Sequence, residues 1–253
     1  METSVPSLRS PGQRVAIGAT VLLAIALVVF GGLRAAAALT MRTATTTRTL
    51  VHPVSALVVD ASDGSVTLVP GNTGEVGVPE HLRWSFSRPR PTLAWSGQTL
   101  TLDGRHCSGG GPFPVNWDCS VSYRLSVPPG ISVRATTSDG QLSLSGITGP
   151  VRATTSNGSI TGLGLGTNVA ARTSDGAIRL SFTHPPSAVN ARTSDGSVHL
   201  FLPPGPTAYR VSAATDNGSS HVGVHTDSGS ANKMRVKTSD GSISFTYAGV
   251  SGH

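Results

Sequence analysis

The sequence predicts an all-β protein whose main domain is a β-solenoid, in which short strands coil into stacked turns. Three observations support this prediction. A polar turn ending in Gly recurs at intervals of 18, 18, 20, 22 and 23 residues, an alternating apolar strand follows most of these turns, and aromatic residues make up only 5% of the chain. Repeats of this length are typical of solenoids, and a thin core of small and branched side chains suits stacked coils.

The repeated phrase is Thr-Ser-Asp-Gly or a close variant, and a shorter copy stands alone upstream at residues 62–64. Asp and Asn hydrogen-bond a turn backbone through their short side chains, and Gly tolerates left-handed angles, so we interpret these positions as structural turns. Two and four residues after each Gly, most phrases have apolar residues, which predicts a buried stripe at strand period. The turn residues are Asp63, Gly64, Asp139, Gly140, Asn157, Gly158, Asp175, Gly176, Asp195, Gly196, Asn217, Gly218, Asp240 and Gly241.

An Asp-Gly pair between alternating strands is also a strong hairpin signal, so an antiparallel β-sandwich or meander of hairpins is the alternative fold. The near-constant interval and the Thr three residues before each repeated Gly favour stacking. Between residues 72 and 126 the repeat disappears, yet strands are expected at 82–86, 92–95, 99–102 and 121–127. Pro-Pro-Gly at residues 128–130 and 203–205 marks corners between strands.

The N-terminal region predicts a membrane protein. Val15–Leu33 is a run of 19 uncharged residues, and a helix of this length would be about 28 Å long, enough to cross a bilayer. We expect an uncleaved signal anchor; a cleaved export signal is the alternative. Long downstream domains are translocated largely regardless of charge, which predicts a single-pass protein of the cell membrane with its C-terminal domain outside the cytoplasm.

From these patterns we expect the chain to have six parts. The expected parts are a cytoplasmic tail (1–14), the transmembrane signal anchor (15–33), a Thr/Ala-rich linker (34–53), the β-strand-repeat domain (54–247), a loop insertion within that domain (103–120) and a C-terminal tail (248–253). Cys107 and Cys119 flank the Gly/Pro-rich part of the insertion. That pattern predicts a disulfide formed in an oxidising compartment, with two unpaired thiols as the alternative.

The phrase from Tyr123 to Gly130, followed by serial Thr-Ser-Asp/Asn-Gly units and by Leu202-Pro203-Pro204-Gly205, resembles the bacterial putative-adhesin β-strand-repeat family, a domain of unknown function. The resemblance covers residues 54–247 and is most specific over 121–245. It implies a β-solenoid-like domain that is often tethered to the outer side of the membrane. It offers no catalytic residues to transfer.

Basic residues recur at even distances before the turn glycines, either six or four residues ahead. Even spacing places them on one side of their strands, so stacked coils would align them into a cationic stripe that could bind a polyanion. A solvated face that offsets the acidic turns is the alternative. The stripe residues are Arg134, Arg152, Arg172, Arg192, Arg235 and Lys237.

Other chemistry is less well supported by the sequence. Each coil supplies one turn carboxylate, which fits a turn role better than a calcium site. The histidines are scattered, and nucleophile, phosphate-loop and dinucleotide motifs are absent from the sequence. We therefore expect no enzyme, no metal, no cofactor, no small-molecule substrate and no nucleic-acid partner.

The function that the sequence favours is a non-enzymatic binding or structural module of the cell envelope, similar to an adhesin. Its expected partners are the membrane and either anionic envelope polymers or another envelope protein. A membrane-tethered component of an envelope-stress sensing system is the alternative, and a carbohydrate-active enzyme is the weakest of the three.

Overall fold

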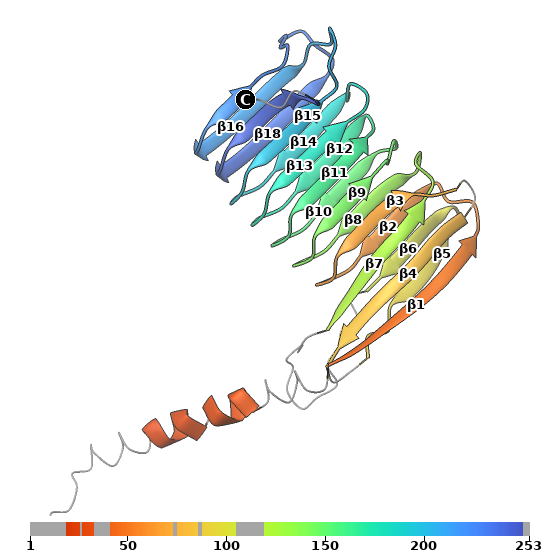
Figure 1. The fold of residues 1–253 in the computed structure, drawn as a ribbon, viewed down its shortest axis with the longest axis vertical. Helices are drawn as coiled ribbons and strands as arrows, with labels where there is room; N and C mark the ends of the chain where they lie inside the picture. Colours follow the sequence, from red (N-terminus) through yellow and green to blue (C-terminus); the bar gives the residue numbers. More distant parts are fainter. Residues whose placement is uncertain are drawn as a thin grey trace, which may run out of the picture.

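The computed structural model describes residues 19–25, 27–32, 41–72, 75–85, 88–104 and 119–249, and from residue 41 onward these are strands, turns and loops. The strands form two long sheets (Figure 1). In spatial order the ten-stranded sheet contains β1 (Arg42–Val51), β4 (Glu75–Trp84), β7 (Ser120–Val127), β3 (Val66–Pro70), β9 (Leu142–Ser145), β11 (Ile160–Leu165), β13 (Ile178–Phe182), β15 (Val198–Leu202), β19 (Ile243–Tyr247) and β17 (Ser220–Val222). The nine-stranded sheet contains β16 (Arg210–Asn217), β18 (Lys233–Asp240), β14 (Ala188–Arg192), β12 (Asn168–Arg172), β10 (Val151–Thr154), β8 (Ser132–Thr136), β2 (Ala56–Asp60), β6 (Thr99–Asp103) and β5 (Thr92–Ser96).

Each coil of the array consists of one strand in the nine-stranded sheet, the polar turn, and one strand in the ten-stranded sheet. Neighbouring coils pair in parallel, with Val151 beside Val133 and Val169, and with Ile160 beside Leu142 and Ile178. This parallel stacking is the arrangement expected of a solenoid, and the hairpin alternative does not describe the array. Antiparallel pairing in the described residues is confined to β1 with β4, β4 with β7, and β5 with β6.

The two sheets enclose a single apolar core because their strands alternate buried and exposed residues. In β8, for example, Val133 and Ala135 are buried while Ser132 and Arg134 are exposed. The residues two and four positions after the turn glycines, such as Leu142 and Leu144, are buried as the periodicity predicts.

The threonine of each repeated phrase links its coil to the preceding one in the stack. The Thr173 hydroxyl donates to the backbone carbonyls of Ser156 and Gly158 at 3.1 and 2.9 Å. Thr137, Thr155, Thr193 and Thr238 make the same pair of contacts with their own neighbouring coils. Five of the repeated threonines are buried, and this hydrogen bonding satisfies their hydroxyls inside the stack.

The turn glycines are required by close packing between coils. A Cβ atom on Gly158 would lie 2.0 Å from the carbonyl oxygen of Gly140, and one on Gly140 would lie 1.9 Å from that of Gly64. The stacking therefore leaves no space for a side chain at these positions.

Three sequence expectations about organisation need correction. The upstream phrase at residues 62–64 is part of the array, because Gly64 lies directly under Gly140. The coil formed by β6 and β7 also belongs to the stack, because β6 pairs in parallel with β2 and β7 pairs in parallel with β3. Last, β18 and β19 lie between the coil of β14 and β15 and the coil of β16 and β17, so the stack does not follow the chain at this end (Figure 1).

The irregular coil at β11 has a local explanation. Gly162 occupies the apolar position, and the register with β13 shifts between Gly162 and Leu165. A Cβ atom at Gly162 would lie 2.4 Å from the Leu165 side chain. The bulge thus turns Leu165 inward to fill the core position that glycine leaves empty.

The linker expected over residues 34–53 is partly strand, since β1 pairs along its whole length with β4. Five of its ten residues are Thr, a β-branched residue that favours strands. At the N-terminus, residues 19–25 and 27–32 are helical. Among the described residues no helix is long and apolar enough to span a membrane.

Several expectations fall outside the described residues: the tail 1–14, the ends of the segment 15–33, Cys107, and residues 250–253. Cys119 is disulfide-bonded. Its pairing with Cys107 stays a prediction.

Candidate functional site

The outer side of the nine-stranded sheet has a dense set of positive charges. Alternation along each strand turns these side chains outward, because their neighbours in the chain are buried in the core. We call this surface the basic face. It consists of eight exposed residues on six adjacent strands: Arg134, Arg152, Arg172, Arg192, Arg210, Lys233, Arg235 and Lys237.

The strand register brings these charges together in short rows. Arg134 pairs with Arg152 across β8 and β10. Arg172, Arg192 and Lys237 form a second row across β12, β14 and β18. Neighbouring strands lie about 4.8 Å apart, so adjacent cations are spaced at about that interval.

The group predicted four residues before glycine forms the second row. In the group predicted six residues before glycine, Arg134 and Arg152 form the first row, and Arg235 lies at the same height but is separated from Arg152 by Ala170 and Asn190. The two groups share one sheet face, as the even spacing predicts, but they lie at different heights along the strands. Arg210 and Lys233 were not predicted from the sequence; they pair with each other across β16 and β18. Each stands eight residues before its turn glycine, so extension of the even spacing would have identified both.

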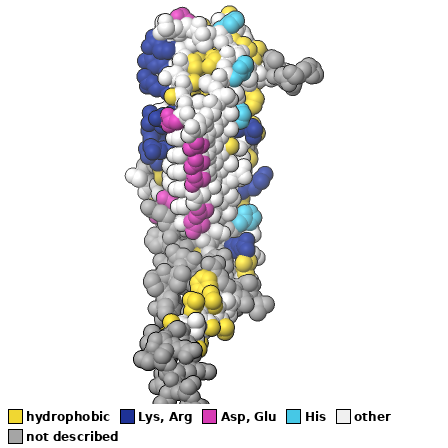
Figure 2. Space-filling model, turned by 90° about the vertical axis from the view of Figure 1, so that its left-hand side faces the viewer, with side chains coloured by type: hydrophobic (Ala, Val, Ile, Leu, Met, Phe, Trp, Pro, Cys, Tyr) yellow, Lys and Arg dark blue, Asp and Glu magenta, His cyan; other side chains and the backbone are white. Residues whose placement is uncertain are grey.

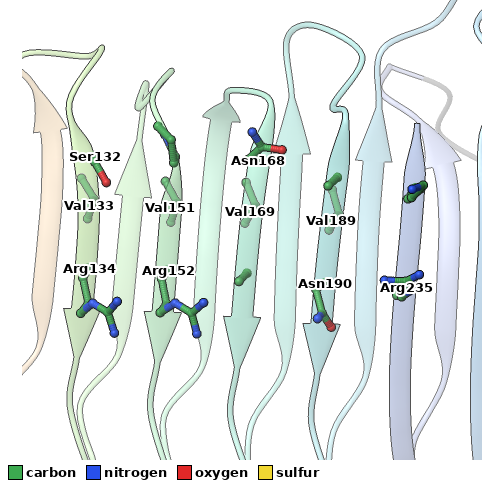
Figure 3. Close-up of a pocket in the computed structure, with 14 residues that line it drawn as sticks. Ser132, Val133, Arg134, Val151, Arg152, Asn168, Val169, Val189, Asn190 and Arg235 are labelled. Carbon is green, nitrogen blue, oxygen red and sulfur yellow. The ribbon is translucent and has the colours of Figure 1, made fainter. Parts of the chain in front are cut away.

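A shallow groove of about 430 Å³ crosses this face over β8, β10, β12, β14 and β18. Figure 3 shows Arg134 and Arg152 side by side, with Asn190 and Arg235 at the same height on later strands. A second hollow of about 160 Å³ continues toward Arg172 and Arg192 and shares Arg152, Ala170 and Asn190 with the first. The small Ala170 side chain, between the arginine pair and Asn190 in the register, leaves this region open.

The face has little negative charge to neutralise these cations. The exposed acidic residues in its six described strands are Asp216 on β16 and Asp240 at the end of β18, next to the turns. The electrostatic potential above the groove is therefore positive, which attracts anions and raises their local concentration.

The turns form a separate acidic ladder beside the basic face (Figure 2). Asp175 and Asp195, and then Asp195 and Asp240, are direct neighbours in the stack. A hydrogen bond with Asp175, some desolvation and the charges of Asp175 and Asp240 raise the pKa of the exposed Asp195 carboxyl. Burial and Asp139 raise the pKa of Asp63 in the same way.

Two amides interrupt this ladder. The Asn157 side chain donates to Asp139 Oδ1, and the Asn217 side chain donates to Asp240 Oδ1 at 2.9 Å. In the described part of the chain, no group of three or more His, Cys, Asp or Glu residues is arranged to hold a metal ion. The ladder is best explained as turn structure.

On the outer face of the ten-stranded sheet, His199 Nδ1 and Ser244 Oγ lie 2.7 Å apart in a hydrogen bond. The scattered histidines of the sequence did not predict this contact. Burial and the nearby Arg179 lower the pKa of His199. The neutral imidazole is therefore favoured, and this residue adds little positive charge to its face.

Comparison with known proteins finds one family model that matches part of the repeat region. Residues 130–246 match the family model described as Toastrack DUF4097. No curated protein matches the chain. Among solved structures, a putative cell adhesion protein from Clostridium sporogenes is 10% identical, covers 81% of this chain and 100% of its own, and has a TM-score of 0.48. A putative adhesin from Bacteroides fragilis is 13% identical, covers 80% of this chain and 97% of its own, and has a TM-score of 0.42.

Proposed function

We propose a function from the surface itself, because the Toastrack DUF4097 model that residues 130–246 match is described without an activity: the basic face binds anionic polymers of the cell envelope. In this proposal the chain is a non-enzymatic, adhesin-like module. The observation that supports it is the alignment of eight exposed cations on six adjacent strands.

The arrangement suits a polymer better than a small anion. The cations follow one another from strand to strand over the groove, so a chain with many negative charges can contact several of them at once. Arginine is well suited to this contact, since its guanidinium group presents a planar fork that matches phosphate and carboxylate oxygens.

We also propose that residues 15–33 anchor the domain to the membrane, which would place the basic face outside the cytoplasm. The large apolar side chains of the described helical residues support this. Leu22 is 70% exposed and Val28 is 75% exposed, as expected of side chains that contact lipid.

A salt series tests the binding function. The full chain, held in a neutral detergent, is titrated with isolated anionic envelope polymers at increasing salt, together with the triple variant R152S/R172S/R192S. We expect binding to weaken with salt, because the contacts are exposed and screened. Loss of three contacts worth about 0.7 kcal/mol each should raise the Kd about thirtyfold.

The matched control removes the same charge from other places. Arg90, Arg124 and Arg179 are exposed and lie off the basic face. The variant R90S/R124S/R179S should bind almost as well as the unmodified chain. Equal losses in both variants would mean that net charge, rather than the basic face, governs binding.

A further inference from the structure

We propose that the groove on the basic face is built for a linear acidic glycan, a polymer with hydroxyl groups between its negative charges. The polymer would cross the strands and run along the axis of the stack. This inference rests on the proposed function and adds the chemical class of the ligand and its direction.

The direction follows from the placement of the charges. On β8, β10, β12 and β14 each strand contributes one outward cation, so a polymer that followed any of these strands would meet a single positive charge. A polymer that crosses them meets Arg134, Arg152, Arg172 and Arg192 in succession. The members of each pair, Arg134 with Arg152 and Arg172 with Arg192, are about 4.8 Å apart, and the row shifts by two residues along the strands between Arg152 and Arg172. One negative charge per monomer unit would match one cation per coil.

The class of polymer follows from the neutral residues in the groove. Ser132, Asn168 and Asn190 line it among the arginines (Figure 3). An amide both donates and accepts hydrogen bonds, and a sugar hydroxyl does the same. The oxygens of an inorganic polyphosphate only accept, so they can pair with the N–H groups of these exposed amides while the amide oxygens keep their water. A polymer with hydroxyl groups can pair with both the N–H donors and the oxygen acceptor of each amide.

The shape of the groove agrees with this class. Ala170 lies between Arg152 and Asn190 in the register, so the floor is open where a sugar ring would rest between two charged contacts. A lipid surface fits less well. In the described residues the large exposed apolar side chains belong to the N-terminal helical residues, to Leu163 and to Val222, and none lies on the nine-stranded sheet.

The test compares two polymers and two variants. The full chain in neutral detergent is titrated with polygalacturonate, which has one carboxylate and free hydroxyls on each sugar, and with inorganic polyphosphate of matched charge. The variant N168A/N190A removes the amides and keeps every cation. Loss of two hydrogen bonds of about 0.7 kcal/mol each should weaken polygalacturonate binding about tenfold. Polyphosphate binding should stay within about twofold, since it depends on charge.

The control variant Q98A/Q141A removes two exposed amides outside the groove and should change neither affinity. If N168A/N190A leaves polygalacturonate binding unchanged, or if polyphosphate or phosphatidylglycerol vesicles bind more tightly than polygalacturonate, the glycan inference is wrong while anion binding by the basic face stands. If the unmodified chain binds none of these probes, the proposed function fails together with the inference.

Discussion

At the scale of single residues, the repeated Thr-Ser-Asp-Gly phrase forms a turn and also makes contacts with the adjacent coil. The sequence shows a constant threonine and a constant glycine, and local turn chemistry accounts for the glycine only in part. The structure gives the remaining reason: the threonine hydroxyl reaches carbonyls of the adjacent coil, and the glycine makes room for that coil's backbone. Such contacts join residues 15–17 positions apart or more, so a single phrase cannot reveal them.

The substitution Gly158→Ala tests this close packing. Its Cβ would lie 2.0 Å from the Gly140 carbonyl oxygen, and the stacked backbone must move to accept it. We expect a loss of about 2 kcal/mol in the free energy of unfolding, measured by thermal or urea denaturation. Gly130→Ala is the control, because nothing lies within 4 Å of a Cβ at that position. Equal stability of the two variants would refute the packing explanation.

At the scale of elements, the alternation of apolar residues predicted the strands of the array and their buried faces. It could not predict the bulge in β11, where Leu165 replaces a core contact from three residues further along the chain. It also missed β1, because a Thr-rich segment with little apolar alternation looks like a linker. That strand forms through antiparallel pairing with β4, a contact about 30 residues away that local patterns do not encode.

The acidic ladder should make the stability of the folded chain depend on pH. The raised pKa of Asp195, caused first by its hydrogen bond with Asp175, means that the folded chain holds this proton more tightly than the unfolded chain. Its stabilising contribution is therefore complete below the ordinary pKa of 3.8 and is lost as pH rises through the raised value.

The Asp195→Asn variant should accordingly have a higher Tm than the unmodified chain at pH 7. The difference between the two Tm values should shrink toward about pH 3. The new amide can donate to a neighbouring carboxylate, as Asn157 does to Asp139. The reverse change, Asn157→Asp, should lower the Tm at pH 7 because it places a carboxylate next to Asp139. Calorimetry at the two pH values checks both; a Tm difference independent of pH would contradict the explanation.

At the scale of the whole molecule, the sequence predicted stacked coils but not their order. Every phrase resembles every other, so nothing in the repeat specifies that β18 and β19 insert before β16 and β17. The strand β17 departs from the apolar pattern, since Ser220 stands two residues after the turn glycine Gly218. Ser220, His221 and Val222 are all exposed in the last coil, where no further coil covers them. On the basic face, the even spacing before the turn glycines predicted six of the eight cations. The placement of Ala170, Asn168 and Asn190 beside them depends on register between strands, which that spacing does not contain.

Deletion of residues 151–168 tests whether the coils are interchangeable units. The deletion removes β10 and β11 and places Val169 where Val151 was, which the parallel register permits. We expect a folded β-rich chain with a lower Tm, since one coil and one interface between coils are lost. Deletion of residues 151–159 removes only half a coil and should prevent folding. Circular dichroism and thermal denaturation compare the two, and equal damage would argue against modular stacking.

The hydrogen-bonded threonine contacts have a consequence for how such a domain can change over time. Since each coil is held by its two neighbours, duplication or loss of one 18-residue unit alters the domain without disturbing distant parts. Each added coil would extend the reach by about 4.8 Å, and one with the pattern of β8, β10, β12 or β14 would add one cation. Reach and valency are thus linked in this architecture, so avidity for a long ligand can be adjusted in whole steps without any new kind of contact.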